Sequence, residues 1–225
     1  MTPLDGFVLS RRVWHSWRVY RLPQEHIEVT SNMVTPSSAR DQPLYQRTLD
    51  DAWHRLSPQI RQLHSIDGES TFVGECNVER GGHPLAWLIA GSIGLPAAGA
   101  NQEIHVTLIQ HDDQEHWIRQ VGRRRFSSTQ GPARAAHESL IRECFGPIAV
   151  YLALDVDGGC LHYLVRRWTL FGIPLPNSIG PRARAVESVD QGRFHFDVEI
   201  RHALCGLIVR YHGTLSPATA AARAG

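Results

Sequence analysis

The stretch 193–201, RFHFDVEIR, alternates strictly between apolar and polar side chains. Its apolar members are Phe194, Phe196, Val198 and Ile200, and its polar members are Arg193, His195, Asp197, Glu199 and Arg201. Residues two apart in a β-strand point to the same face of a sheet. The stretch therefore predicts a strand with one face in an apolar core and the other in water or in a polar cavity.

Strand-like sequence recurs on both sides of this stretch. The candidates are 71–80, 103–110, 116–121, 123–129, 139–145, 148–156, 160–170, 183–189 and 206–215. Several are joined by short glycine-containing turns, such as DVDGGCL at 155–161 and VDQGRF at 189–194. About ten strands linked in this way are typical of an antiparallel meander or barrel.

Two segments before residue 96 predict helices. In 41–65, apolar residues recur every three or four positions, and Ser57-Pro58 predicts a break followed by a second short helix. We expect this apolar stripe to cover one face of the sheet. Residues 84–95 are apolar nearly all the way round, so this helix is buried, closes over an apolar space, or touches a membrane surface.

The run TLFGIPLPNSIGP, 169–181, is apolar but contains Pro174, Pro176 and Pro181, which interrupt strand pairing. We expect a stiff loop. It packs either on the similar run GSIGLPAAG at 91–99 or, together with that run, over the mouth of the sheet. Two interpretations stay open: a simply covered barrel end, or a portal for an apolar ligand.

These patterns predict an α+β fold, a large curved antiparallel sheet or partly closed, lipocalin-like β-barrel with N-terminal helices packed on it. A helix-grip fold is the alternative, but the tail SPATAAARAG is too short for its long C-terminal helix. The expected organisation is a flexible extension at 1–42, in which Met33 is an alternative start, one domain at 43–217 and a disordered tail at 218–225.

Composition excludes several classes of protein. The 225 residues carry 23 basic and 22 acidic side chains, a net charge of +1, which argues against nucleic-acid binding through a broad basic face. No apolar run reaches the roughly 18 residues of a transmembrane helix. Four scattered cysteines without a CxxC pair favour a reducing compartment. We therefore expect a soluble, cytoplasmic protein.

The segment from Pro43 to Pro217 resembles the bacterial domain-of-unknown-function family four-one-six-six. The resemblance rests on PLYQRTLDDAWHRLSPQIRQLH, GECNVERG, GLPAAG, EHWIRQVGRRRFSS, ECFGPIAVYLAL, FGIPLP, GRFHFDVEI and GLIVRYHGTL, in this order. It implies a domain found alone or attached to saccharopine-dehydrogenase-like or epimerase-like reductases, and it implies no catalytic residue. The chain has no GxGxxG motif, so a reductase partner would be a separate protein.

No motif for catalysis, a cofactor or a metal stands out. There is no GxSxG motif, and HDDQEH at 111–116 is typical of a solvated turn rather than of a metal site. The GRRRF stretch at 122–126 is typical of a solvated edge. Whether the chain is an enzyme is left open.

The best interpretation is a barrel that binds a small apolar ligand. Trp87, Trp168, Phe171 and Ile173 would line or cover its entrance, and Arg167 or Arg210 would hold a polar end of the ligand. The alternatives are an accessory module that docks on an oxidoreductase through the apolar loops, or an enzyme acting on an apolar substrate. Asp197, Glu199, Arg210 and His212 are further candidates: inside the barrel they would orient the polar end of a bound ligand. In the enzyme, Asp197, Glu199 and His212 would act as acid and base, and a cross-strand ion pair is the structural alternative for this group.

Overall fold

The computed structural model describes residues 42–135 and 138–218. The extension predicted at 1–42 and the tail at 218–225 lie almost entirely outside these residues. The strands are β1 (Glu69–Arg80), β2 (Gly99–His111), β3 (Gln114–Val121), β4 (Arg124–Ala135), β5 (Glu138–Phe145), β6 (Ile148–Asp157), β7 (Cys160–Leu170), β8 (Ile173–Leu175), β9 (Pro181–Asp190), β10 (Arg193–His202) and β11 (Gly206–Pro217).

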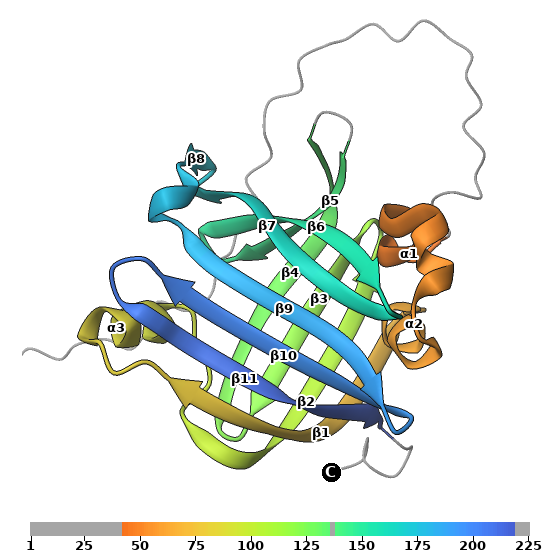
Figure 1. Cartoon of the computed structure of the whole chain (residues 1–225), viewed down its shortest axis with the longest axis horizontal. Coiled ribbons are helices and arrows are strands. Elements are labelled where there is room, and N and C mark those ends of the chain that lie inside the picture. Colours follow the sequence, from red (N-terminus) through yellow and green to blue (C-terminus); the bar gives the residue numbers. More distant parts are fainter. Residues whose placement is uncertain (1–41, 136–137, 219–225) are drawn as a thin grey trace, which may run out of the picture. The chain divides into compact units, whose positions relative to one another are not determined.

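Ten of these strands form a closed antiparallel barrel (Figure 1). Neighbours along the chain pair with one another from β1 to β7 and from β9 to β11, and β1 pairs with β11. The pairing of β6 with β7, and of β7 with β9, completes the ring, while β8 pairs only with the end of β7. The predicted antiparallel barrel is confirmed, and its closure is complete rather than partial.

The alternation in β10 divides the inside of this barrel from the outside. Strand β10 pairs with β9 through residues 193–202 and with β11 through residues 194–202. Its four apolar side chains, Phe194, Phe196, Val198 and Ile200, all face the barrel interior. The prediction of one core face and one outer face is confirmed.

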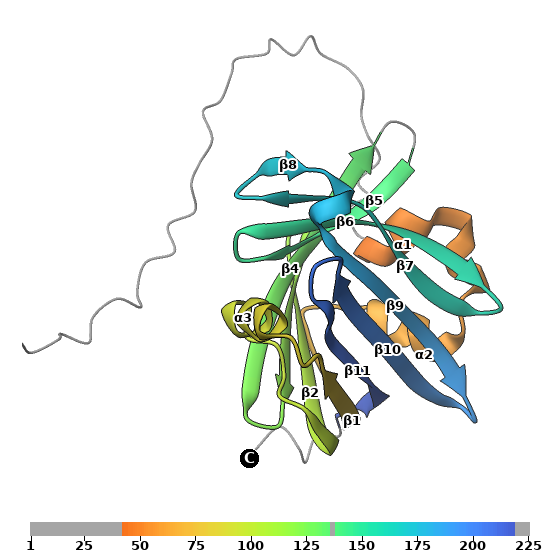
Figure 2. The same cartoon turned by 60° about the vertical axis from the view of Figure 1, so that its left-hand side comes forward.

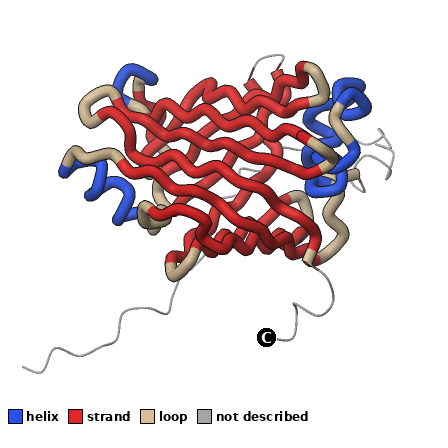
Figure 3. The backbone as a smooth tube through the Cα atoms, turned by 60° about the horizontal axis from the view of Figure 1, so that its bottom comes forward, coloured by secondary structure: helices blue, strands red, loops and turns tan. Residues whose placement is uncertain are grey.

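The N-terminal helices cover one end of the barrel and not a sheet face (Figure 3). They are α1 (Leu44–Leu49), the 3₁₀ helix η2 (Asp50–Arg55) and α2 (Pro58–His64). The break at Ser57-Pro58 is confirmed, with Pro58 in the first turn of α2. The expectation that the stripe covers a sheet face was wrong, because a closed barrel offers its open end as the apolar surface to cover.

The other end of the barrel carries α3 (Pro84–Ser92) and the crossover from β7 to β9, which contains β8 and the 3₁₀ helix η3 (Asn177–Ile179) (Figures 1 and 2). The helix α3 buries Ala86 and Ala90, whereas Trp87 and Leu88 are exposed. None of the helices in the described ranges is both long and apolar enough to span a bilayer.

The run 169–181 was predicted as a loop, and this was wrong for its first half. Leu170 pairs with Ile173 and Thr169 with Pro174, and Phe171 and Gly172 form the turn with φ of 51° and 80°. Pro174 is compatible with this strand because β8 is an edge strand and has a partner on one side alone.

Candidate ligand-binding cavity

The barrel encloses a cavity of about 340 Å³, within the range of roughly 300–1,000 Å³ that is typical of small-molecule sites. Most of its wall is apolar. The apolar lining includes Ile104, Val106, Phe126, Val150, Leu152, Phe194, Phe196, Val198, Ile200, Ile208 and Leu215. Because these side chains come from strands all round the barrel, the cavity lies along the barrel interior and not between strands.

The cavity is closed at the end that α1 and α2 cover. Tyr45 of α1 and Leu63 of α2 line it, and both are almost completely buried. At the opposite end the lining includes Ile93, Leu95, Ile179 and His202. We call the part of the cavity that these four residues line the mouth. Ile179 is 52% exposed although it lines the cavity, so the cavity reaches the surface at the mouth.

The barrel wall is weakest beside the mouth. Strands β7 and β9 pair through Leu161–Leu164 and Arg184–Glu187 alone, and the last residues of β7, Trp168–Leu170, pair with β8. The Trp168 side chain lines the cavity here, and its Nε1 donates to the carbonyl of Pro176 at 3.1 Å. A Cβ atom at Gly180 would collide with this indole ring, so glycine is required opposite Trp168.

Five polar residues, the floor cluster, meet at the closed end: Tyr45, His64, Gln130, Tyr163 and Glu187. The Tyr45 hydroxyl donates to Oε1 of Gln130 at 2.8 Å, and the Tyr163 hydroxyl donates to Oε1 of Glu187 at 2.8 Å. His64 Nε2 lies 2.7 Å from Oε2 of Glu187, and the His64 ring stacks on Tyr45 with centroids 3.6 Å apart. Side chains from two helices and three strands thus form one hydrogen-bonded network.

Burial fixes the protonation of both tyrosines. Loss of hydration raises the pKa of Tyr45 well above its ordinary value, and nearby Glu115 and Glu187 add to the shift. The pKa of Tyr163 is raised for the same first reason, with Glu187 as the next cause. Both hydroxyls therefore remain protonated donors at the floor of the cavity.

A second polar group, the wall cluster, lies on strands β3, β4 and β5. Arg119 donates to the Ser128 hydroxyl at 2.8 Å and to Glu143 at 3.2 Å, and Ser128 donates to Glu143 at 2.6 Å. The Arg119 guanidinium also lies over the rings of Trp117 and Phe126, 4.8 and 5.7 Å from their centroids. The charge of Arg119 is thus already matched by Glu143 inside the barrel.

Together these groups define a site for a molecule with an apolar body and a limited polar part. The apolar wall would contact the apolar body of the molecule. Arg119, Glu143 and Glu187 of the two clusters would contact its polar part, and these three side chains already form hydrogen bonds with one another or with Ser128 and Tyr163. No group of three or more His, Cys, Asp or Glu side chains suited to a metal ion occurs within residues 42–135 and 138–218.

Of the residues selected from the sequence, Trp168 lines the cavity. Trp87 is exposed on α3, with its Nε1 donating to the carbonyl of Gly81 at 2.7 Å. Phe171 and Ile173 are exposed on the β7–β8 hairpin beside the mouth. Arg167 is exposed and stacks on Tyr151, with its Cζ 3.9 Å from the ring centroid. None of these four is part of the lining.

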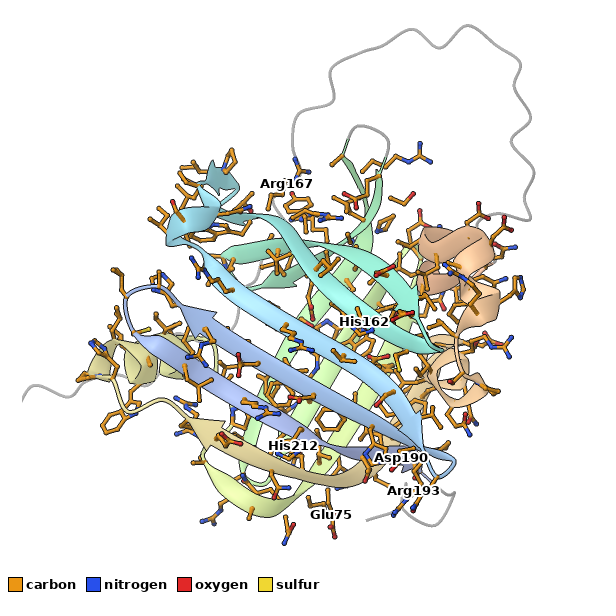
Figure 4. The ribbon with its side chains drawn as sticks, in the orientation of Figure 1. Glu75, His162, Arg167, Asp190, Arg193 and His212 are labelled. Carbon is orange, nitrogen blue, oxygen red and sulfur yellow. The ribbon has the colours of Figure 1, made fainter. Side chains whose placement is uncertain are left out.

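The predicted group on β10 and β11 faces outward. Arg210 donates to both carboxylate oxygens of Asp197, at 3.1 and 2.7 Å, and Glu199 and His212 lie in the same outer groove. The alternation explains this placement, since the apolar residues of β10 occupy the interior. Figure 4 labels His212 and Arg167 on separate parts of the barrel wall, so these residues do not form one site.

Sequence reasoning missed the polar residues that do face the cavity. Arg119 lies between Trp117 and Val121 on the inward side of β3, and Glu143 lies between Ile141 and Phe145 on β5. A charged residue at an inward position of an alternating strand was the available signal. The contribution of Tyr45 and His64 from α1 and α2 had no such signal, because it depends on which end of the barrel these helices cover.

The fold and the site define a class: an up-and-down β-barrel with an apolar internal cavity that is closed at one end. The chain belongs to the family described as "Domain of unknown function (DUF4166)", whose model matches residues 56–215, as the resemblance indicated. A search of the curated proteins gave no match.

Among solved structures, the chain is similar to a secretary abundant heat soluble (SAHS) protein from Ramazzottius varieornatus. The identity is 11% and the TM-score 0.33, over 66% of this chain and 93% of that one.

Proposed function

We propose that the chain binds a small, largely apolar molecule inside the barrel. The observation that carries this proposal is the cavity of about 340 Å³, which is closed by α1 and α2 at one end and reaches the surface beside Ile179 at the other. A filled barrel would bury its inward side chains against one another. Here the inward side chains line a cavity, and apolar cavity surface of this kind binds apolar ligands.

The charges at the cavity favour a neutral ligand over a carboxylic acid. Two carboxyl side chains, Glu143 and Glu187, line the cavity together with one guanidinium, that of Arg119. The guanidinium is paired with Glu143, so Arg119 is not a free cation for a ligand carboxylate, which would also lie near Glu187. A hydroxyl or amide group, in contrast, can donate to either carboxylate. We therefore assign the ligand as a neutral, long or polycyclic apolar molecule with a hydroxyl or amide group.

A cavity-filling substitution tests this assignment. Ala185 lines the cavity from β9, and its neighbour Arg184 faces the outside. We expect Ala185→Trp to reduce the binding of the neutral dye Nile red at least about tenfold, because the indole occupies the ligand volume. The matched variant Arg184→Trp adds the same side chain outside and should bind the dye like the wild type.

Competition identifies the ligand class. A long-chain alcohol should displace the dye about tenfold more effectively than the fatty acid of equal length, since only the acid carries a charge into the barrel. Dye binding that is unchanged in Ala185→Trp would contradict binding in the cavity. Stronger displacement by the acid would contradict the assignment of a neutral ligand.

The alternatives from the sequence receive less support. An enzyme using Asp197, Glu199 and His212 would need them at the cavity, and they lie in the outer groove. Docking on an oxidoreductase would use the exposed apolar loops, which are considered next.

A further inference from the structure

Exposed large apolar side chains gather at the mouth end of the barrel. Among the described residues there are seven, and all but Leu164 of β7 belong to α3, to the β7–β9 crossover or to the β10–β11 turn (Figures 1 and 2). We call this set the exposed rim; its members are Trp87, Leu88, Phe171, Ile173, Ile179 and Leu204. Leu88, Phe171 and Leu204 are 69%, 77% and 74% exposed, which is costly in water unless the surface contacts another apolar phase.

At the mouth end, the connections between strands contain no acidic residue, whereas Glu79 of β1 and Glu103 of β2 lie on the strands beside them. The five connections at this end, 81–98, 122–123, 146–147, 171–180 and 203–205, contain no Asp or Glu. Basic side chains adjoin them: Arg123, Arg124 and Arg125 are exposed at the β3–β4 turn and form no ion pair within the described part of the chain. The opposite end, in contrast, carries Asp112 and Asp113 in the β2–β3 turn.

This arrangement matches a bilayer surface better than a flat protein interface. Apolar side chains on three separate segments surround an opening, and a bilayer can take up each of them without a shaped partner. The neighbouring arginines provide the charge complementarity that anionic headgroups require. With the mouth on the bilayer, a poorly water-soluble ligand passes between the acyl layer and the cavity without crossing water.

We infer that the mouth end docks on membranes containing anionic lipid, with the exposed rim in the headgroup and acyl boundary and the arginines of the β3–β4 turn on the headgroups. This inference rests on the proposed function for its purpose, the exchange of an apolar ligand. Docking itself is measurable without any ligand, so the two proposals can fail separately.

The test is flotation of the full chain with vesicles of phosphatidylcholine alone and with about a third of phosphatidylglycerol. We expect binding to the anionic vesicles, weakened by high salt. The variant Leu88→Ser/Phe171→Ser should lower this binding about 100-fold, from roughly tenfold for each side chain lost from the apolar phase. Replacement of Arg123, Arg124 and Arg125 by Gln should weaken binding to the anionic vesicles about 100-fold, from roughly fivefold per arginine.

The matched control is Leu164→Ser, which removes an exposed leucine from the middle of β7, away from the mouth. It should bind vesicles like the wild type. All these substitutions are on the surface, and thermal unfolding of each variant checks that the barrel is intact.

Three results would overturn the inference. The first is no binding to either kind of vesicle. The second is binding that survives the Leu88/Phe171 substitution, which would place the membrane contact elsewhere in the chain. The third is a wild-type dimer that the same substitution converts to a monomer, which would make the rim an interface between two copies. Dye binding by the same samples reports on the cavity independently: vesicle binding without dye binding would overturn the proposed function alone.

Discussion

Glu115 and His64 each retain a buried polar atom without a hydrogen-bond partner among the described residues. These atoms are Oε1 of Glu115 and Nδ1 of His64, and both residues are at most 1% exposed. The other oxygen of Glu115 accepts from the Trp117 indole at 3.0 Å. Burial raises the pKa of the Glu115 carboxyl, although His64 and the Trp117 hydrogen bond oppose the shift. A carboxyl at this position is thus a cost to folding once it is ionised.

The pH dependence of this cost can be measured with Glu115→Gln. A raised pKa in the folded state means that the folded chain binds the proton more tightly, so stability is lost as pH rises through that pKa. The amide does not titrate and can still accept from Trp117. We expect the variant to have a free energy of unfolding about 1 kcal/mol above the wild type near pH 8, and the difference to vanish below about pH 4. Denaturant titrations at both pH values check this, and a variant less stable near pH 8 would contradict it.

At the scale of elements, β1 and β11 approach each other closely enough to require glycine. A Cβ atom at Gly213 would collide with the carbonyl oxygen of Glu75, and one at Gly74 would collide with that of Thr214. Both collisions are with backbone atoms, which cannot rotate away. Glycines in paired strands allow the sheet to bend sharply, and a barrel needs such bends to close.

We therefore expect Gly213→Ala to reduce the free energy of unfolding by about 2 kcal/mol, as overpacking does in a tight interior. Gly82→Ala is the control, since no atom lies within 4 Å of its Cβ position and its φ is ordinary. It should change stability by less than about 0.5 kcal/mol. Equal free energies of unfolding of the two variants in urea would contradict this, because they would show that a methyl group fits between β1 and β11.

The strands could be predicted from the sequence, whereas the position of the N-terminal helices could not. Strand alternation in 193–201 predicted both the strand and its inward face, because the period of two is a local property. The outward placement of Asp197 and Arg210 follows from the same alternation once the interior is known to be apolar. The end-capping role of α1 and α2 could not be predicted, since it depends on pairings such as β6 with β7 that close the ring across the whole sheet. The floor cluster was missed for the same reason, because His64 and Glu187 are 123 positions apart.

At the scale of the whole molecule, the two ends of the barrel differ in chemistry. One end is sealed by helices over the floor cluster, and the other carries the mouth, the exposed rim and connections without acidic residues. Closure of the ring leaves few strand edges free, here that of β8, so the ends of the barrel are the places where function varies. The cavity reaches the surface at the mouth, where the lining residue Ile179 is exposed.

The most direct test of a ligand-binding barrel is native mass spectrometry of the full chain after incubation with a lipid extract of its source organism. The account predicts one bound molecule per chain that is lost on denaturation, that is neutral when recovered in organic solvent, and that is absent from Ala185→Trp but present in Arg184→Trp. A wild-type chain that carries no adduct from such an extract, or an adduct that Ala185→Trp retains in full, would contradict it.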